Sequence, residues 1–382
     1  MESVSIIGLD LAKTIFQAHG NDERGAKLFS RKLRRDELLS FFAVQSPTLV
    51  AMEACASSHY WGREIRALGH DVRLIPAQHV KPFVKRGKND AADAEAICEA
   101  AVRPNMRFVQ IKGSEKQSQG MVIHMRDLLV RQRTQLINHV RGNCAESGVI
   151  SGVGNKGFEQ LKAHILATKA AHDKVKAEEQ VRAQAEPKEC LGKGGLGKRA
   201  LNALAAAKSL QAMIETMAND LLAELLEVID VLSDHIDRLD KVIESLAKND
   251  KSLKALRSIP GVGPITALAI KALGPDPTLF KSGRDYSAWM GLVPSQSSSG
   301  GKERLGKITK KGNKTLRRLL VICAGSFITS VMRGRSQPDP WLKAMLTRHP
   351  RMKVITAMAN KLARIIWAIQ IKGGVYQAPK PV

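Results

Sequence analysis

The sequence predicts an α/β domain at the N-terminus followed by a mainly helical chain. Residues 3–76 alternate short, β-branched apolar runs with amphipathic stretches, whereas residues 201–247 carry apolar side chains at three- and four-residue steps. At 382 residues the chain is long enough for two or three units, each with its own core. We expect the α/β domain over residues 1–112, a helical connector over 113–250 and a basic, mainly α-helical domain over 251–382.

The first domain begins with an apolar run, Ser3–Leu11, that predicts a buried strand with Asp10 at its end. Two further strands of an antiparallel meander are expected on either side of a turn-forming segment. The remaining elements follow in order. The predicted segments are strands Ile15–His19 and Ala26–Lys32, helix Arg35–Gln45, strand Thr48–Glu53, helix His59–Leu68 and strand Asp71–Pro76. This order is that of a ribonuclease-H-like fold, in which the first strand and the later two lie side by side.

Four carboxylates are placed to meet at one edge of this domain. Asp10 and Glu53 end neighbouring strands, and Asp90 and Asp93 share one face of a helix capped by Asn89. Converging carboxylates repel one another, and oxygen ligands of this kind suit Mg²⁺ or Mn²⁺, which serve phosphodiester chemistry. We therefore expect a divalent metal site. The alternative is that each acid is an ordinary strand-end or helix-start residue.

Long helices are expected over residues 113–250, with a Gly-rich break at Ser147–Gly157. The predicted helices are Gln117–His139, Lys162–Glu189 and Leu201–Ala247, the longest. The last carries an apolar stripe of Leu221, Leu222, Leu225, Val228, Leu232, Ile236, Leu239, Val242 and Leu246. Such a stripe predicts a helical hairpin or coiled coil, with Gln117–His139 or with a second subunit, and core packing within one chain is the alternative. The basic turn Lys193–Lys198 is interpreted as a linker, and residues 150–200 have no assigned role.

The chain is strongly basic, with 60 Lys and Arg against 36 Asp and Glu and a net charge of +24. Residues 301–382 hold 18 of these cations against two acids, Glu303 and Asp339. An excess concentrated in this way predicts a polyphosphate partner, DNA or RNA. The low aromatic content of 4% argues against a single-strand binder that works mainly by base stacking.

The five cysteines have no zinc-ligand spacing and are expected to be reduced. They are Cys55, Cys98, Cys144, Cys190 and Cys323. The N-terminal residues lack a signal-peptide pattern, and we see no apolar run near the roughly 20 residues of a membrane helix. A cytoplasmic protein without a membrane partner is expected.

Two motifs in the C-terminal domain suit contact with a nucleic-acid backbone. Pro260-Gly261-Val262-Gly263 lies between helical segments in the form of a helix–hairpin–helix, whose glycines let backbone N–H groups approach a DNA phosphate. The second motif places Ser297, Ser298 and Ser299 before two glycines and a run of cations. The phosphate-contact residues predicted there are Gly300, Gly301, Lys302, Arg304, Lys307, Lys310, Lys311, Lys314, Arg317 and Arg318. A hydroxyl nucleophile beside a polyanion fits this layout, as does a flexible solvated loop.

In this order the motifs resemble the DEDD transposases of the IS-110 and IS-1111 insertion sequences. The matching residues are Asp10, Glu53, Asp90-x-x-Asp93, Pro260-Gly-Val-Gly, Gly291-Leu-x-Pro, Ser299-Gly-Gly-Lys, Arg304, Gly306, Lys310-Lys311-Gly-Asn313 and Leu316-Arg317. The resemblance implies a RuvC-like domain, a coiled-coil connector and a C-terminal transposase domain, and hence a transposase or site-specific DNA recombinase. It also implies that the four acids hold Mg²⁺ and that Ser299 attacks a DNA phosphate covalently. Ser298 is the alternative nucleophile, one residue away.

The same resemblance implies further partners. An RNA encoded by the element is expected to select donor and target double-stranded DNA by base pairing, and the enzyme is expected to act as a homo-oligomer, a dimer or tetramer. Two other functions remain open from the residues alone. One is a metal-dependent, junction-resolving endonuclease with water as the nucleophile, and the other is a non-catalytic nucleic-acid scaffold.

Overall fold

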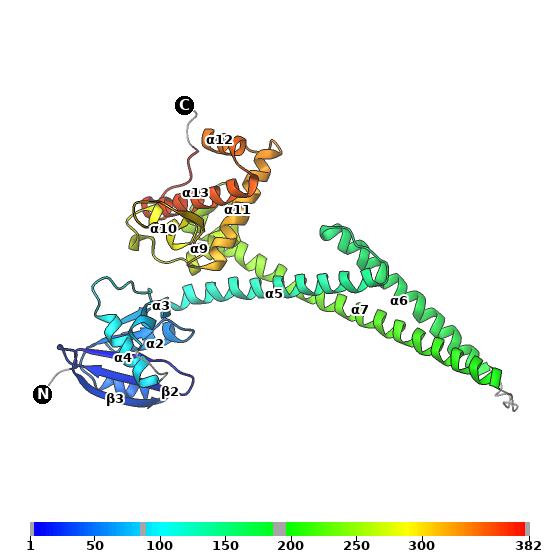
Figure 1. Ribbon diagram of the computed structural model, residues 1–382, viewed down its shortest axis with the longest axis horizontal. Coiled ribbons are helices and arrows are strands. Elements are labelled where there is room, and N and C mark those ends of the chain that lie inside the picture. Colours follow the sequence, from blue (N-terminus) through cyan, green and yellow to red (C-terminus); the bar gives the residue numbers. More distant parts are fainter. Residues whose placement is uncertain (1–3, 85–88, 186–195, 379–382) are drawn as a thin grey trace. The chain divides into compact units, whose positions relative to one another are not determined.

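A computed structural model describes residues 4–84, 89–185 and 196–378 of the chain (Figure 1). Residue contacts divide the chain into two compact units, Met1–Met121 with Ala247–Val382, and Val122–Leu246. The predicted linker Lys193–Lys198 lies partly outside the described residues, and Cys190 lies wholly outside them. The other four cysteines are free thiols, as expected.

The N-terminal domain is built on one mixed five-stranded sheet of order β3-β2-β1-β4-β5. Its strands are β1 (Ile6–Asp10), β2 (Ile15–Asn21), β3 (Lys27–Arg34), β4 (Leu49–Glu53) and β5 (Asp71–Ile75). β2 runs antiparallel to β1 and β3, whereas β1, β4 and β5 are parallel. The predicted strand order is therefore confirmed, with the first strand beside the fourth.

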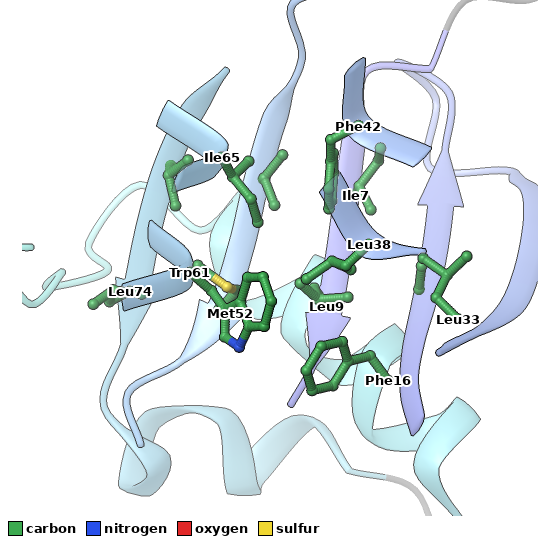
Figure 2. Close-up of a cluster of buried hydrophobic side chains, with 13 residues drawn as sticks. Ile7, Leu9, Phe16, Leu33, Leu38, Phe42, Met52, Trp61, Ile65 and Leu74 are labelled. Carbon is green, nitrogen blue, oxygen red and sulfur yellow. The ribbon is translucent and has the colours of Figure 1, made fainter. Parts of the chain in front are cut away.

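Helices cover both faces of this sheet. α1 (Leu38–Ala43) and α2 (Ser58–Ala67) pack on one face against Ile7 and Leu9, as Figure 2 shows. α3 (Ala77–Val80), the short 3₁₀ helix η1 (Lys81–Phe83) and α4 (Asp90–Ala101) pack on the other. Since successive strand residues point to opposite faces, Asp10 lies on the α4 side.

One helix of this domain is shorter than predicted. The helix expected over Arg35–Gln45 is reduced to α1 because the preceding hairpin continues further. β3 extends to Arg34, and the N–H of Arg35 still donates to the carbonyl of Thr14 at 3.1 Å. Extended pairing with the neighbouring strand therefore continues to the first residue of the predicted helix, and α1 begins only at Leu38.

Three long helices form the second unit and its flanks: α5 (Ser114–Glu146), α6 (Gly154–Ala185) and α7 (Leu196–Asn249). Of the predicted Gly-rich break Ser147–Gly157, residues 147–153 lie between α5 and α6, whereas Gly154–Gly157 form the start of α6. The last residues of the predicted helix Lys162–Glu189, from 186 on, lie outside the described residues. Phe158 and Ile165 of α6 share a buried cluster with Val140 of α5 and Leu226 of α7. Lys162 of α6 donates to Asp230 of α7 at 2.6 Å, and Arg126 of α5 pairs with Asp240 of α7.

The buried face of α7 differs from the predicted stripe. Of the stripe, Ile236 is buried as predicted, whereas Leu221, Val228 and Val242 are exposed and are not packed within the chain. The other buried residues of α7 lie outside the predicted stripe: Ala223, Leu226, Ile229, Ile243 and Ala247. α7 packs against both α5 and α6. The side of α7 that faces these two helices is buried, and part of the predicted stripe lies outside that side.

The C-terminal domain is mainly α-helical. Its elements are α8 (Lys251–Arg257), α9 (Pro264–Leu273), η2 (Pro277–Leu279), α10 (Gly283–Trp289), β6 (Pro294–Gln296), β7 (Leu305–Ile308), α11 (Lys314–Met332), α12 (Pro340–Arg348) and α13 (Arg351–Lys372). α13 packs against α11, α10, α12 and α8.

By length and composition alone, α11 and α13 are apolar enough to cross a membrane. The expectation from the sequence, that no apolar run reaches this length, misses both helices. They pack against each other, and each has a fully buried side, with Leu320 and Ile328 on α11 and Leu362 and Ile366 on α13. Two helices that meet only this length and composition test do not indicate a membrane protein.

The sheet core generates a stability prediction. Phe16 is fully buried, and its ring lies edge-on to that of Trp61 at 5.4 Å (Figure 2). Phe16→Ala should destabilise the N-terminal domain by about 3–5 kcal/mol, because it leaves a cavity under α2. Hydrogen exchange of β1 and β2 peptides along a urea titration measures this loss. Ile15→Ala, on the same strand but half-exposed, is the control and should change stability by less than about 0.5 kcal/mol. Equal effects of the two changes would contradict the assigned core.

Candidate functional site

Two strand ends bring acids to one edge of the sheet. β1 and β4 are parallel neighbours, with Leu9 opposite Met52, so Asp10 and Glu53 end their strands at the same level. Both acids follow a residue of the α1–α2 core, Leu9 or Met52, and both therefore point to the face covered by α4.

The start of α4 supplies the other two acids. The predicted cap is confirmed, because the Asn89 side chain accepts the N–H of Ala91 at 3.1 Å. The Asn89 carbonyl also accepts the N–H of Asp93 at 3.0 Å. The helix thus begins at Asp90, and Asp90 and Asp93 both lie in its first turn.

These elements gather the predicted acids. One carboxylate oxygen from each of Asp10, Asp90 and Asp93 lies within 4.8 Å of the others. Burial raises the pKa of Asp10 to about 6, helped by the negative charges of Asp93, Asp90 and Glu53. Burial, followed by the charge of Asp93, also raises the pKa of Glu53. Glu53 therefore belongs to the same electrostatic cluster, although its oxygens lie outside the tightest group.

The donor set fits a divalent cation. It consists of carboxylate oxygens alone, the ligands preferred by Mg²⁺ and Mn²⁺. Burial first, and the neighbouring carboxylates second, disfavour the ionised form of Asp10 and raise its pKa. A bound cation would offset that repulsion and keep the acids ionised.

The serine motif forms the tip of a β-hairpin. β6 and β7 are antiparallel, and beyond them the N–H of Ser297 donates to the carbonyl of Arg304 at 3.0 Å. The N–H of Lys302 donates to the carbonyl of Ser299 at 3.1 Å, which closes a two-residue turn. Its central residues, Gly300 and Gly301, have φ of 56° and 75°, the positive values that a type I′ turn requires. The two glycines therefore have a conformational role besides the predicted phosphate contact.

The two candidate serines differ in their hydrogen bonds. The Ser298 hydroxyl accepts the N–H of Arg304 at 3.2 Å and the side-chain amide of Gln296 at 3.1 Å. Within the described part of the chain, no hydrogen bond is recorded for the hydroxyl of Ser299, which is exposed next to the turn. Ser298 thus helps to hold the hairpin, while the Ser299 hydroxyl is available.

The base of the hairpin is locked to the neighbouring helices. Gly291 and Gly312 have positive φ, and a Cβ on Gly291 would lie 2.1 Å from the carbonyl oxygen of Lys311. Arg317 of α11 donates from one nitrogen, Nη1, to the carbonyl oxygens of Met290 at 3.1 Å and Lys311 at 2.9 Å. Sequence reasoning assigned Arg317 only to phosphate contact and missed this clamp, for which no local signal exists.

The other predicted phosphate-contact side chains are exposed. They are Lys302, Arg304, Lys307, Lys310, Lys311, Lys314 and Arg318, on the hairpin, its base and the start of α11. In the turn between α8 and α9, Gly261 has a φ of 84°, and a Cβ there would lie 2.6 Å from the carbonyl oxygen of Cys323 on α11. Gly263 begins α9 as its N-cap and has open space beside it. Packing against α11 thus explains Gly261 without DNA, and the half-buried Gly263 has a backbone hydrogen bond to the thiol of Cys323.

The acid cluster generates a pH prediction for the metal-free protein. The raised pKa of Asp10 contributes stability that is present below about pH 4 and lost as the pH rises through about 6. The Asn side chain of Asp10→Asn stays neutral at every pH. With a chelator present, the melting temperature of this variant at pH 7 should exceed that of the unmodified protein by on the order of a few degrees. The difference between the two melting temperatures should shrink at pH 4. Thermal unfolding at both values measures this, with exposed Glu23→Gln as control. A gap independent of pH would contradict the assigned repulsion.

Comparison with known proteins finds relatives that match nearly the whole chain. A putative transposase y4pF/y4sB of Sinorhizobium fredii is 39% identical over 99% of this chain and 87% of its own length. A probable family 20 transposase of Pseudomonas aeruginosa is 39% identical over 98% of this chain and 99% of its own. The transposase for insertion sequence element IS1111A of Coxiella burnetii is 36% identical over 99% of this chain and 92% of its own length.

Two family models match the two regions that carry the site. A model for the DEDD transposase domain of the IS110 type matches residues 7–145, which include all four acids. A model described as the transposase IS116/IS110/IS902 family matches residues 253–339, which include the serine hairpin. These matches confirm the resemblance seen in the motifs and identify a DNA-cutting and recombining enzyme. The chain therefore belongs to the IS116/IS110/IS902 family of transposases.

Proposed function

We propose that this transposase is a metal-dependent DNA recombinase in which Asp10, Glu53, Asp90 and Asp93 hold Mg²⁺ or Mn²⁺ and Ser299 is the nucleophile. The convergence of three carboxylates within 4.8 Å carries the metal part of the proposal. Nuclease domains of the DEDD type generally use divalent metals, which supports it. When bound, the cation would polarise a phosphate oxygen and stabilise charge on the leaving oxygen.

The available hydroxyl of Ser299 supports the covalent part. In the proposed step its oxygen attacks a DNA phosphorus, and the bond from that phosphorus to one bridging sugar oxygen breaks. The serine proton passes to solvent or a base, and the leaving oxygen takes up a proton to become a free hydroxyl. The product is a phosphoserine ester, so the phosphodiester bond energy is kept for rejoining when another DNA hydroxyl attacks and releases the serine.

Exposed cations around the hairpin suit the DNA backbone. Lys302, Arg304 and Lys307 lie on the hairpin itself, where they can approach non-bridging phosphate oxygens. We assign the turn that contains Gly261 and Gly263 the same kind of contact, because its sequence has the form of a helix–hairpin–helix. Such contacts position a duplex without reading its sequence, so target choice needs another source.

The proposed organisation follows from these sites. The catalytic acids belong to residues 1–112, the connector to 113–250 and the serine domain to 251–382. We place the enzyme in the cytoplasm, as expected from its reduced cysteines. By resemblance to its family, it acts as a homo-oligomer with acids and serine drawn from different subunits, and an RNA from its own element selects DNA by base pairing. The large positive charge is compatible with RNA as well as DNA.

A second function deserves a test because the acid cluster alone is sufficient for it. A junction-resolving endonuclease would use the same carboxylates to hold a cation and would cut with water, leaving the serine hairpin as a backbone-binding element. The fate of Ser299 separates the two functions.

Ser299→Ala should lower formation of a covalent protein–DNA adduct and strand exchange by roughly 10³-fold or more, because no other group replaces the nucleophile. Denaturing gels of protein on labelled donor DNA measure the adduct. Ser298→Ala is the matched control and should cost less than about tenfold, since it removes only hydrogen bonds within the hairpin. Undiminished cleavage by Ser299→Ala would establish water as the nucleophile.

The RNA proposal has its own test. Protein purified from cells that carry the gene with its flanking DNA should retain one RNA transcribed from that flank, and sequencing of the bound RNA identifies it. Changing the RNA bases that match the target should redirect insertion to the newly complementary DNA. Unaltered insertion sites after such changes would show that the protein itself reads the target.

A further inference from the structure

β1 contains a glycine at the point where α4 crosses it. A Cβ on Gly8 would lie 2.3 Å from the carbonyl oxygen of Ala94, 2.7 Å from the sulfur of Cys98 and 3.0 Å from the Cys98 nitrogen. Two of these three atoms are α4 backbone atoms, which cannot move aside without the helix. Gly8 pairs with His19 of β2 in the strand register and does not have a positive φ. Glycine at this position therefore allows the close approach of α4 to β1 and is not required by the backbone conformation.

The contact lies directly beside the acid cluster. Ala94 follows Asp93 in the chain, and Gly8 precedes Asp10 by two residues on the same face of the sheet. The thiol of Cys98 donates to the carbonyl of His19 at 3.3 Å and anchors the next turn of α4 to β2. Burial raises the pKa of this thiol to about 12, so it remains a protonated donor.

We propose that Gly8 is a positioning residue: by allowing α4 to touch β1, it sets the distance of Asp90 and Asp93 from Asp10. The inference rests on the proposed metal centre and adds the element that determines its geometry. A helix moves as a rigid unit, so displacement at Ala94 carries both acids of its first turn. A methyl group at Gly8 requires a shift of about 1 Å to reach ordinary van der Waals distance from the Ala94 oxygen.

A displacement of that size matters for the cation. Mg²⁺ requires near-ideal octahedral ligand geometry, and changes in the groups that orient metal ligands typically cost about 10–100-fold in affinity. Gly8→Ala should therefore lower metal affinity while leaving all four carboxylates in place. A residue needed only for folding would lower stability without a specific effect on the metal.

The experiment measures Mn²⁺ binding to the full chain without DNA, from the electron paramagnetic resonance signal of free Mn²⁺. The unmodified protein should bind, Asp10→Asn should bind weakly, and Gly8→Ala should lose at least about tenfold in affinity. Gly20→Ala is the matched control. Its Cβ would meet the ring of Phe29 at 2.2 Å, in the same sheet but away from α4, so it should lower stability and change Mn²⁺ affinity by less than about twofold.

The outcomes separate the two levels of the proposal. If the unmodified protein binds no Mn²⁺, the proposed metal centre fails. If it binds and folded Gly8→Ala binds equally well, the role of Gly8 fails while the metal centre stands. A loss of affinity in Gly20→Ala equal to that in Gly8→Ala would also overturn the positioning role, because it would reflect general destabilisation.

A second pair of variants covers the case in which Gly8→Ala does not fold. Cys98→Ala removes the thiol contact but leaves the Ala94 carbonyl in place, so the double variant Gly8→Ala with Cys98→Ala relieves one clash of three. The double variant should still bind Mn²⁺ at least about tenfold more weakly than Cys98→Ala alone. Equal affinity of the two would overturn the proposal.

Discussion

The close packing of α4 on β1 is the constraint on which the acid cluster depends. Carboxylates repel one another, and the raised pKa of Asp10 records that repulsion together with burial. What holds them together is the apolar contact of α4 with the sheet, through Ile97, Ala100 and Ala101, and the absence of a side chain at Gly8. Burial of the helix thus supplies the free energy that keeps like charges close.

The serine hairpin is held by a different kind of interaction. Its residues are exposed, so little apolar burial fixes them, and backbone hydrogen bonds with positive-φ glycines determine its shape instead. Arg317 joins the two ends of the hairpin by bonding carbonyls on both sides of its base. A rigid base with an exposed tip suits a nucleophile that must reach a large, charged substrate.

Local patterns were enough for much of the N-terminal domain. Strand order, the Asn89 cap and the positions of Asp10 and Glu53 at strand ends followed from short runs of apolar residues and their ends, because period-2 alternation and capping act within a few residues. The stripe on α7 was only partly right. Val228 and Val242 fit a helical period, yet they are exposed because the positions of α5 and α6 decide which side is buried.

The sequence by itself determined the family, through the ordered motifs from Asp10 to Ser299, and the oxygen-rich chemistry of its acids. Only the tertiary structure decided that Ser298 bonds within the hairpin while Ser299 has a free hydroxyl, and that Gly8 lies under Ala94. The physical reason is the range of the interactions. Residue type and spacing express local preferences. The steric contact of Gly8 with α4 joins residues about ninety positions apart, which only folding brings together. The hydrogen bonds of Ser298 span two and six positions, but they depend on the exact shape of the hairpin, which residue type does not specify.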